Sequence, residues 1–445
     1  MMKNTPAHII SESSMSPYQW VVIGLCILIN MLDGFDVLVM AFTAAAVSSQ
    51  WSLTAVQLGY LLSAGLVGMA LGSLFIAPWA DRLGRRPIIL LCVAIAGIGM
   101  LLSSFAPNPV LLGCLRLLTG LGIGGILASS YVIAGEYANK RWRGLAISLQ
   151  STAYALGATL GGFAAAKIIP DLGWPSVFFY GGVITLLLLP LLMLLLPESL
   201  DYLAHSDADN ALERINTILR RLGREVLTAK PEPEKTTGDN RNMLAQLFGT
   251  ALRSTTLLIW LTFFLVMFGF YFVMSWTPKL LTSAGLSASQ GITGGVLLNL
   301  GGIVGTTLIG LLSSRVALPR LLVVYLLANA LALTLFVSST SSLSLAYSLA
   351  LLIGILVNGS IAGVYALTPS LYSTRQRVTA LGWAIGVGRA GAILSPIAAG
   401  YLLDHAWQAA GLYRLFALVF VFAALAIAIL AGVRSRYRQA ELASG

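Results

Sequence analysis

The chain has 445 residues, of which 57% are apolar and only 10% are charged, and its mean hydropathy is +0.86. Soluble proteins carry about 25% charged residues, and single cores stop growing near about 250–300 residues, so this composition excludes a soluble globular protein. The net charge of +10 does not indicate a nucleic-acid partner, because the basic residues fall in short clusters between apolar runs. Lipid must replace water around most of the chain.

Apolar runs long enough to cross a bilayer, which takes about 20 residues, recur after a polar start at residues 1–17. This start lacks a cleavable signal pattern, so we expect the first run to be retained. We predict an all-α membrane protein whose twelve transmembrane helices form two pseudo-symmetric six-helix bundles. The predicted spans are 18–47, 54–79, 87–106, 110–137, 144–169, 175–197, 255–283, 288–314, 321–339, 344–368, 378–403 and 411–433.

The longest polar stretch lies between the sixth and seventh predicted spans. It holds nine of the 17 acidic residues, and within it Leu212, Ile215, Leu219 and Leu222 recur at helical spacing. This pattern predicts a short amphipathic helix on the membrane surface. The predicted domains are an N-terminal tail 1–17, a six-helix bundle 18–197, a linker 198–253, a second six-helix bundle 254–433 and a C-terminal tail 434–445.

The distribution of basic residues predicts the orientation of the chain. If the N-terminus is cytoplasmic, 22 of the 27 lysines and arginines lie in segments on that side, and three lie on the other. Loops rich in lysine and arginine stay in the cytoplasm. We therefore expect both termini and the linker to be cytoplasmic. We also expect the protein to be a multi-pass monomer of the bacterial inner membrane.

Two carboxylates lie inside the first span, where a charge costs roughly 2.5–3.5 kcal/mol at the helix centre. Asp33 and Asp36 are three residues apart, so both project to one side of the helix, and Gly34 permits a close neighbour. Burial disfavours a charged carboxylate and a nearby arginine favours it, so either residue could exchange a proton as its access changes. A structural Asp–Arg pair that only locks helices together is the alternative.

Two arginines also lie deep in predicted spans. Arg116 has a depth similar to that of Asp36, so we predict that it pairs with Asp36 or Asp33 and modulates proton affinity; a snorkelling arginine is the alternative. Arg389 has no deep acidic residue in its own half, so we predict that it binds a substrate carboxylate bidentately, unless a backbone carbonyl satisfies it. Arg116, once freed, is a second candidate for binding the substrate.

The seventh span is rich in aromatic residues. Tyr271 in this span, with Asn299 and Trp383 elsewhere in the second half, could stack on and hydrogen-bond an aromatic substrate, although aromatic stripes more often serve packing. The sequence contains no GxxxxGK[ST] loop, HExxH motif or cysteine cluster, so it predicts neither ATP hydrolysis nor metal catalysis. We expect no cofactor, with the proton gradient as the driving force.

The junction between the second and third spans reads Ala80-Asp81-Arg82-Leu83-Gly84-Arg85-Arg86-Pro87. Asp81 is placed to cap the N-terminus of another helix, such as the eleventh span, through the helix dipole. Arg85 or Arg86 is placed to reach Glu136 at the end of the fourth span. A positive-inside anchor alone would explain the arginines, but not Asp81 or Gly84. The predicted cytoplasmic gate comprises Asp81, Gly84, Arg85, Arg86, Glu136 and Arg143.

This junction closely resembles the signature loop of the major facilitator superfamily, and Arg116-Leu-Leu-Thr-Gly120-Leu-Gly122 resembles its fourth-span motif. Leu32-Asp33-Gly34-Phe35-Asp36, Ser275-Trp276-Thr277-Pro278 and Gly382-Trp383-x5-Arg389 resemble the aromatic acid:proton symporters within it. The resemblance implies transport roles for the first-span aspartates and Arg116, and a role in the conformational cycle for Asp81, Arg85 and Arg86. Ala158 stands where the superfamily's antiporter pattern has proline, which favours symport.

The resulting hypothesis is a proton-coupled symporter, not an enzyme, that imports a small aromatic or related organic carboxylate by alternating access. Benzoate, a hydroxybenzoate and a muconate are examples of such acids. The expected partners are the acid, the proton and the lipid bilayer. Two alternatives stay open: a proton antiporter that exports hydrophobic compounds, and a membrane sensor that binds such acids without transport.

Overall fold

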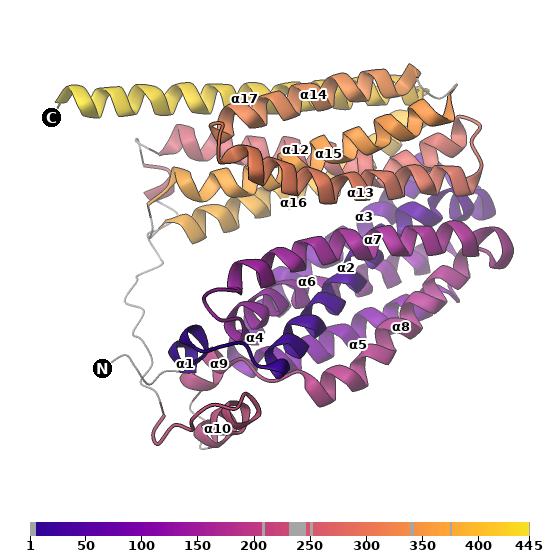
Figure 1. Ribbon diagram of the computed structural model, residues 1–445. Helices are drawn as coiled ribbons and strands as arrows, with labels where there is room; N and C mark the ends of the chain where they lie inside the picture. Colours follow the sequence, from indigo (N-terminus) through magenta and orange to yellow (C-terminus); the bar gives the residue numbers. More distant parts are fainter. Residues whose placement is uncertain are drawn as a thin grey trace. The chain divides into compact units, whose positions relative to one another are not determined.

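The computed structural model describes residues 6–206, 210–230, 246–249, 252–338, 342–373 and 376–444. Every regular element in these ranges is helical, and twelve helices are long and apolar enough to cross a membrane (Figure 1). The predicted all-α class with twelve membrane helices is therefore confirmed. Parts of the predicted tails and linker, namely residues 1–5, 207–209, 231–245, 250–251 and 445, lie outside the described ranges.

The helices follow the predicted spans closely. After α3 the chain passes through a π-helical turn, Gly72–Ile76, and a 3-10 turn, Ala77–Trp79, and a 3-10 turn, Thr368–Leu371, follows α15. The helices are α1 (Pro6–Glu12), α2 (Pro17–Trp51), α3 (Ala55–Leu71), α4 (Ala80–Leu83), α5 (Arg85–Ser103), α6 (Pro109–Tyr137), α7 (Arg143–Leu172), α8 (Trp174–Leu195), α9 (Leu200–His205), α10 (Ala211–Arg221), α12 (Arg253–Ser283), α13 (Ala288–Ser313), α14 (Leu318–Ser338), α15 (Leu343–Leu367), α16 (Arg377–Asp404) and α17 (Ala409–Ser444).

The chain divides into two compact units. Three long helices, α2, α3 and α7, contribute residues to both of them. Unit 1 comprises Met1–Val39, Ala64–Gly161 and Leu172–Thr237, and unit 2 comprises Met40–Ser63, Gly162–Asp171 and Gly238–Gly445.

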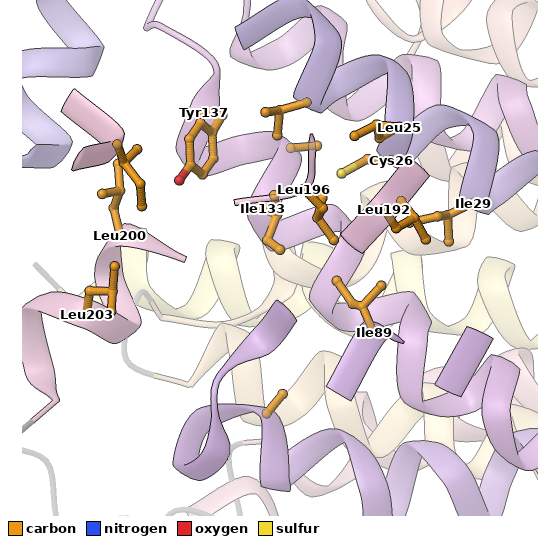
Figure 2. Close-up of a cluster of buried hydrophobic side chains, with 14 of the residues drawn as sticks. Leu25, Cys26, Ile29, Ile89, Ile133, Tyr137, Leu192, Leu196, Leu200 and Leu203 are labelled. Atoms are coloured by element: carbon orange, nitrogen blue, oxygen red, sulfur yellow. The ribbon is translucent and has the colours of Figure 1, made fainter. Parts of the chain in front are cut away.

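A cluster of buried apolar side chains joins the long helices of unit 1 to its short ones. Cys26 of α2, Ile89 of α5 and Leu192 of α8 belong to it, together with Leu200 and Leu203 at α9 (Figure 2). The short helices α1, α9 and α10 each contribute buried apolar side chains to this cluster, and α9 contacts both α1 and α10.

The amphipathic helix expected in the linker is α10. Ile215 and Leu219 on its apolar face are fully buried in the same cluster as Leu203. The prediction that this face lies on the membrane surface is therefore wrong. A helical apolar stripe indicates only that the face is covered, and the sequence pattern does not distinguish a protein neighbour from lipid.

Helices α2 and α7 approach so closely that their backbones touch. A Cβ atom on Gly34 of α2 would collide with the backbone carbonyl of Tyr154, and one on Gly157 of α7 would collide with that of Met31. Small residues permit this kind of backbone contact between membrane helices. The pair of glycines thus fixes the turn of α2 that carries Asp33 and Asp36.

Gly157→Ala is expected to destabilise unit 1, because its new methyl group has no space between the two backbones. Overpacking typically costs about 1–3 kcal/mol, which would lower the midpoint of thermal unfolding in detergent. Gly144→Ala on the same helix is the matched control, since a Cβ there meets nothing within 4 Å. Equal midpoints for the two variants would contradict the close contact.

Candidate functional site

Arg116 of α6 and Asp36 of α2 form a buried ion pair in unit 1. Nη1 of Arg116 lies 3.0 Å from Oδ1 of Asp36, with 3% and 10% of the two side chains exposed. Nη2 donates hydrogen bonds of 2.9 Å to the hydroxyls of Ser103 and Thr119, and the guanidinium lies 4.8 Å from the centre of the Phe178 ring. Arg116 therefore contacts Asp36, one of its two predicted partners, and does not snorkel.

Asp33 lies one turn before Asp36 and is also buried, with 7% exposed. Both residues line one small cavity of about 20 Å³. A cavity that holds benzene measures about 150 Å³, so this space does not admit an aromatic substrate. The other lining residues are Ile29 and Leu32 of α2, Val93, Ala96 and Met100 of α5, Ile123 and Ile126 of α6, and Thr185 and Leu188 of α8.

A buried polar network one turn before Asp33 escaped the sequence analysis. Nδ2 of Asn30 donates to the carbonyl of Cys26 at 2.9 Å, to the hydroxyl of Ser130 at 3.1 Å and to Oε1 of Gln150. Asn30, Ser130 and Gln150 are each at most 2% exposed. The network joins α2, α6 and α7 beside Asp33. Uncharged polar residues within apolar runs were its only signal.

The predicted substrate-binding residues of unit 2 lie on three helices. Arg389 of α16 is half-buried and forms no ion pair with any residue that the structure describes. Gly382 and Gly386, on the same face of α16, would place a Cβ with nothing within 4 Å. No part of the described chain therefore covers this face at the two glycines beside Arg389.

The other three candidates are held by packing or by local bonds. The ring of Trp383 stacks on Trp260 at 6.0 Å, and Tyr271 contacts Phe270 edge-on at 5.1 Å. Asn299 of α13 is buried, and its Nδ2 donates to the carbonyl of Gly295 at 2.9 Å. Much of the aromatic stripe serves packing instead, since Phe264, Phe268 and Phe272 stack on one another or on Phe416.

A second contact that the sequence analysis missed holds the first turn of α3. The carboxylate of Asp404, the last residue of α16, accepts hydrogen bonds from the backbone N–H groups of Ala55 at 2.8 Å and Val56 at 3.0 Å. A carboxylate at a helix N-terminus satisfies unpaired donors and complements the helix dipole. Gly400, one turn earlier, has no room for a Cβ against the Ala55 backbone, so α3 and α16 fit tightly here.

Three of the predicted gate residues, Asp81, Arg85 and Glu136, form a cluster in unit 1. Nη1 of Arg85 pairs with Glu136 and donates to the hydroxyl of Ser199 at 2.9 Å. Asp81 lies 3.6 Å from Arg85 with 76% of its side chain exposed, and its predicted cap on the eleventh span stays a prediction. Arg86 and Arg143 contact the backbone carbonyls of Met193 and Gly135 instead of Glu136.

Glu198 organises the same junction, a role that the sequence analysis did not assign. Its Oε1 accepts hydrogen bonds from the backbone N–H groups of Arg85 at 2.8 Å and Arg86 at 3.1 Å, so it caps α5. Gly84 precedes this helix with φ of 103°, a conformation that disfavours residues with a side chain. A Cβ on Gly84 would also press against the Glu198 carboxylate.

Glu136→Gln is expected to lower the free energy of unfolding by about 1.5–3 kcal/mol, because Arg85 loses its shortest ion pair and keeps only the exposed Asp81 and Asp201, at 3.6 Å and 3.9 Å. The double variant Arg85→Met/Glu136→Gln should lose less, since it removes both charges. Chemical unfolding of the purified protein measures Glu136→Gln, the single variant Arg85→Met and the double variant, with the exposed Glu213→Gln as control. A double variant as unstable as the sum of the two single variants would contradict the pairing.

The fold and the buried charges together define a polytopic membrane transporter. Residues 23–362 match the profile of the Major Facilitator Superfamily. The chain is 36% identical over 436 residues to a gallate transporter of Pseudomonas putida, covering 96% of this chain and 95% of that protein. It is 34% identical to the 4-hydroxybenzoate transporter PcaK of Pseudomonas aeruginosa, covering 90% and 89%.

The chain belongs to the major facilitator superfamily and, within it, to the aromatic acid:proton symporter family that the motifs indicated. A crystal structure of a D-xylose–proton symporter has the same fold, with a TM-score of 0.70 and 18% identity over 92% of this chain and 97% of that one. Family membership makes the chain a multi-pass membrane transporter and not an enzyme.

Proposed function

We propose that this chain is a proton-coupled symporter that imports a small aromatic carboxylate, such as a hydroxybenzoate or benzoate. Its similarity to transporters of gallate and 4-hydroxybenzoate supports this substrate class. The observation that carries the coupling is the buried Arg116–Asp36 pair, with a second buried carboxylate, Asp33, one turn away.

The chemistry of the pair links the proton to the substrate. A proton on Asp36 removes the negative charge that balances Arg116, and an unbalanced buried charge is costly. A substrate carboxylate restores the balance at Arg116, so proton and acid favour each other's binding. Arg389, half-buried beside the open face of α16, is the second cation that this anion engages.

The transporter works as a monomer in a bacterial inner membrane, with both termini and the linker in the cytoplasm and without a bound cofactor. The proton gradient is its driving force. The bias of 22 among 27 basic residues toward one side supports this orientation. The Arg85–Glu136 cluster then belongs to the cytoplasmic gate, whose contacts break and reform as access alternates.

Uptake of labelled 4-hydroxybenzoate into proteoliposomes under an imposed pH gradient tests the proposal. Accumulation should follow the gradient, because one pH unit supplies about 1.4 kcal/mol per proton, a tenfold concentration ratio. Aromatic acids also cross lipid in their neutral form, so protein-free vesicles set the baseline. Uptake that exceeds this baseline but ignores the gradient would rule out proton symport.

The second candidate is a proton antiporter that exports hydrophobic compounds. Cells that lack it should become more sensitive to such compounds, whereas loss of a symporter should impair growth on aromatic acids. Ala158 at the antiporter motif's proline position argues against export. A sensor would bind the acid and show no flux in proteoliposomes.

A further inference from the structure

The small cavity between Asp33 and Asp36 carries a further inference, which rests on the proposed proton-coupled symport. Its walls come from α2, α5, α6 and α8 of unit 1. Its volume of about 20 Å³ exceeds the roughly 10–15 Å³ that one water molecule needs. The cavity therefore fits one water molecule, although it excludes an aromatic ring.

The lining of the cavity favours a bound water over an empty space. Two carboxylates, Asp33 and Asp36, and one hydroxyl, Thr185, belong to it, and the remaining lining side chains are apolar. Thr185 donates its own hydrogen to the carbonyl of Gly181 at 2.9 Å, so its oxygen is left to accept. A buried water needs two to four polar partners, whereas cavities with none stay dry.

The spacing of the two carboxylates suits a bridge through one water. Residues three apart on a helix have Cβ atoms about 5–6 Å apart. Carboxylate oxygens of such neighbouring side chains can each lie about 2.8 Å from one shared water molecule. The helix itself sets this spacing, and the packing of Gly34 against the backbone of Tyr154 holds this turn of α2 in place.

We propose that this cavity binds a water molecule that relays the coupling proton between Asp33 and Asp36. The protonated carboxyl of Asp33 gives its proton to the water, and the water gives one of its own to the carboxylate of Asp36. One O–H bond breaks and one forms at each end, the water is regenerated, and a single proton moves. Transfer occurs when a substrate carboxylate replaces Asp36 as the counter-ion of Arg116, because Asp36 is then free to accept the proton.

The surroundings fit this direction of transfer. On α6, Arg116 pairs with Asp36. From α5 and α8, only apolar side chains and Thr185 line the cavity. The two carboxylates thus face different neighbours across one water site, which makes them unequal proton carriers.

Filling the cavity tests the relay. Ala96→Val puts two extra methyl carbons into the lining, and Ala94→Val on the same helix is the matched control outside it. Two rates are compared in proteoliposomes: accumulation driven by a pH gradient, and exchange of labelled for unlabelled acid at equal pH. We expect Ala96→Val to lower the ratio of accumulation to exchange at least tenfold, and Ala94→Val to leave this ratio within twofold of wild type.

A second variant keeps the test decisive if Ala96→Val does not fold. Thr185→Val preserves side-chain shape and removes the hydroxyl, and Thr159→Val on α7, whose hydroxyl also bonds its own helix, is its control. Thr185→Val should lower the same ratio at least threefold. Ratios equal to those of the controls would overturn the relay while leaving the symport proposal intact. A wild-type protein that ignores the gradient would overturn the proposed function, and the relay with it.

Discussion

Asp36→Asn is expected to abolish accumulation of an aromatic acid against its gradient. Asparagine has the shape of a protonated aspartic acid but neither takes nor releases a proton, so the cycle loses its coupling step. The accumulation ratio should fall from about tenfold per pH unit and proton to the protein-free baseline. Exchange at equal pH should persist, because it needs no net proton movement.

The control for this variant is Asp171→Asn, which removes an exposed carboxylate near the end of α7. Asp36→Asn also leaves Arg116 without its counter-ion, so its folding must be checked by size-exclusion chromatography before transport is compared. A folded Asp36→Asn protein that still accumulates acid in proportion to the pH gradient would remove Asp36 from the coupling mechanism.

Arg389→Gln is expected to raise the apparent KM for an aromatic acid by about 10–100-fold. Hydrogen bonds to a charged group contribute roughly 1.5–3 kcal/mol, and each 1.4 kcal/mol corresponds to a factor of about ten. The apparent KM of Arg389→Lys should lie between those of the wild type and Arg389→Gln, because lysine keeps the positive charge but lacks the planar fork of the guanidinium. Initial rates of uptake over a range of acid concentrations measure the effect.

The variant Arg414→Gln controls for the loss of one positive charge, because Arg414 is an exposed arginine of α17 in the same unit. A neutral aromatic alcohol gives a second control. Because it lacks the carboxylate, it should inhibit uptake of the acid equally weakly in the wild type and in both Arg389 variants. An unchanged KM in Arg389→Gln would show that the half-buried guanidinium serves another purpose, and the carboxylate would then be assigned to Arg116 alone.

The sequence predicted the charged residues inside apolar helices best. Asp36 and Arg116 stand out because a membrane span contains few charges, and similar depth in two spans pointed to their contact. Uncharged polar residues gave no such signal, so Asn30 and Gln150 were missed although they are more deeply buried than Asp36. Asp404 and Glu198 were missed because they cap helices through backbone groups, which no residue pattern identifies.

The linker helix shows the same limit from the apolar side. The spacing of its apolar residues correctly predicted that one face of α10 is buried. Lipid was expected to bury that face, whereas in the structure it packs in one cluster with Leu200 and Leu203. Arg389 was predicted from its depth and from the lack of a deep acidic residue in its own half, whereas Tyr271, Asn299 and Trp383 were predicted from residue type. Trp383 stacks on Trp260, a contact between two helices far apart in the sequence that no local pattern contains.

The sequence by itself determined the twelve membrane helices, the resemblance to the family and the charges that lie deep within the spans. Hydrophobic length and the cost of a buried charge are local properties, and each residue carries them wherever the chain folds. Only the tertiary structure decided that Arg116 contacts Asp36, that Gly34 and Gly157 bring α2 against α7, and that a water-sized space lies beside both aspartates. These features depend on how side chains of separate helices fill space, which packing fixes and sequence spacing does not.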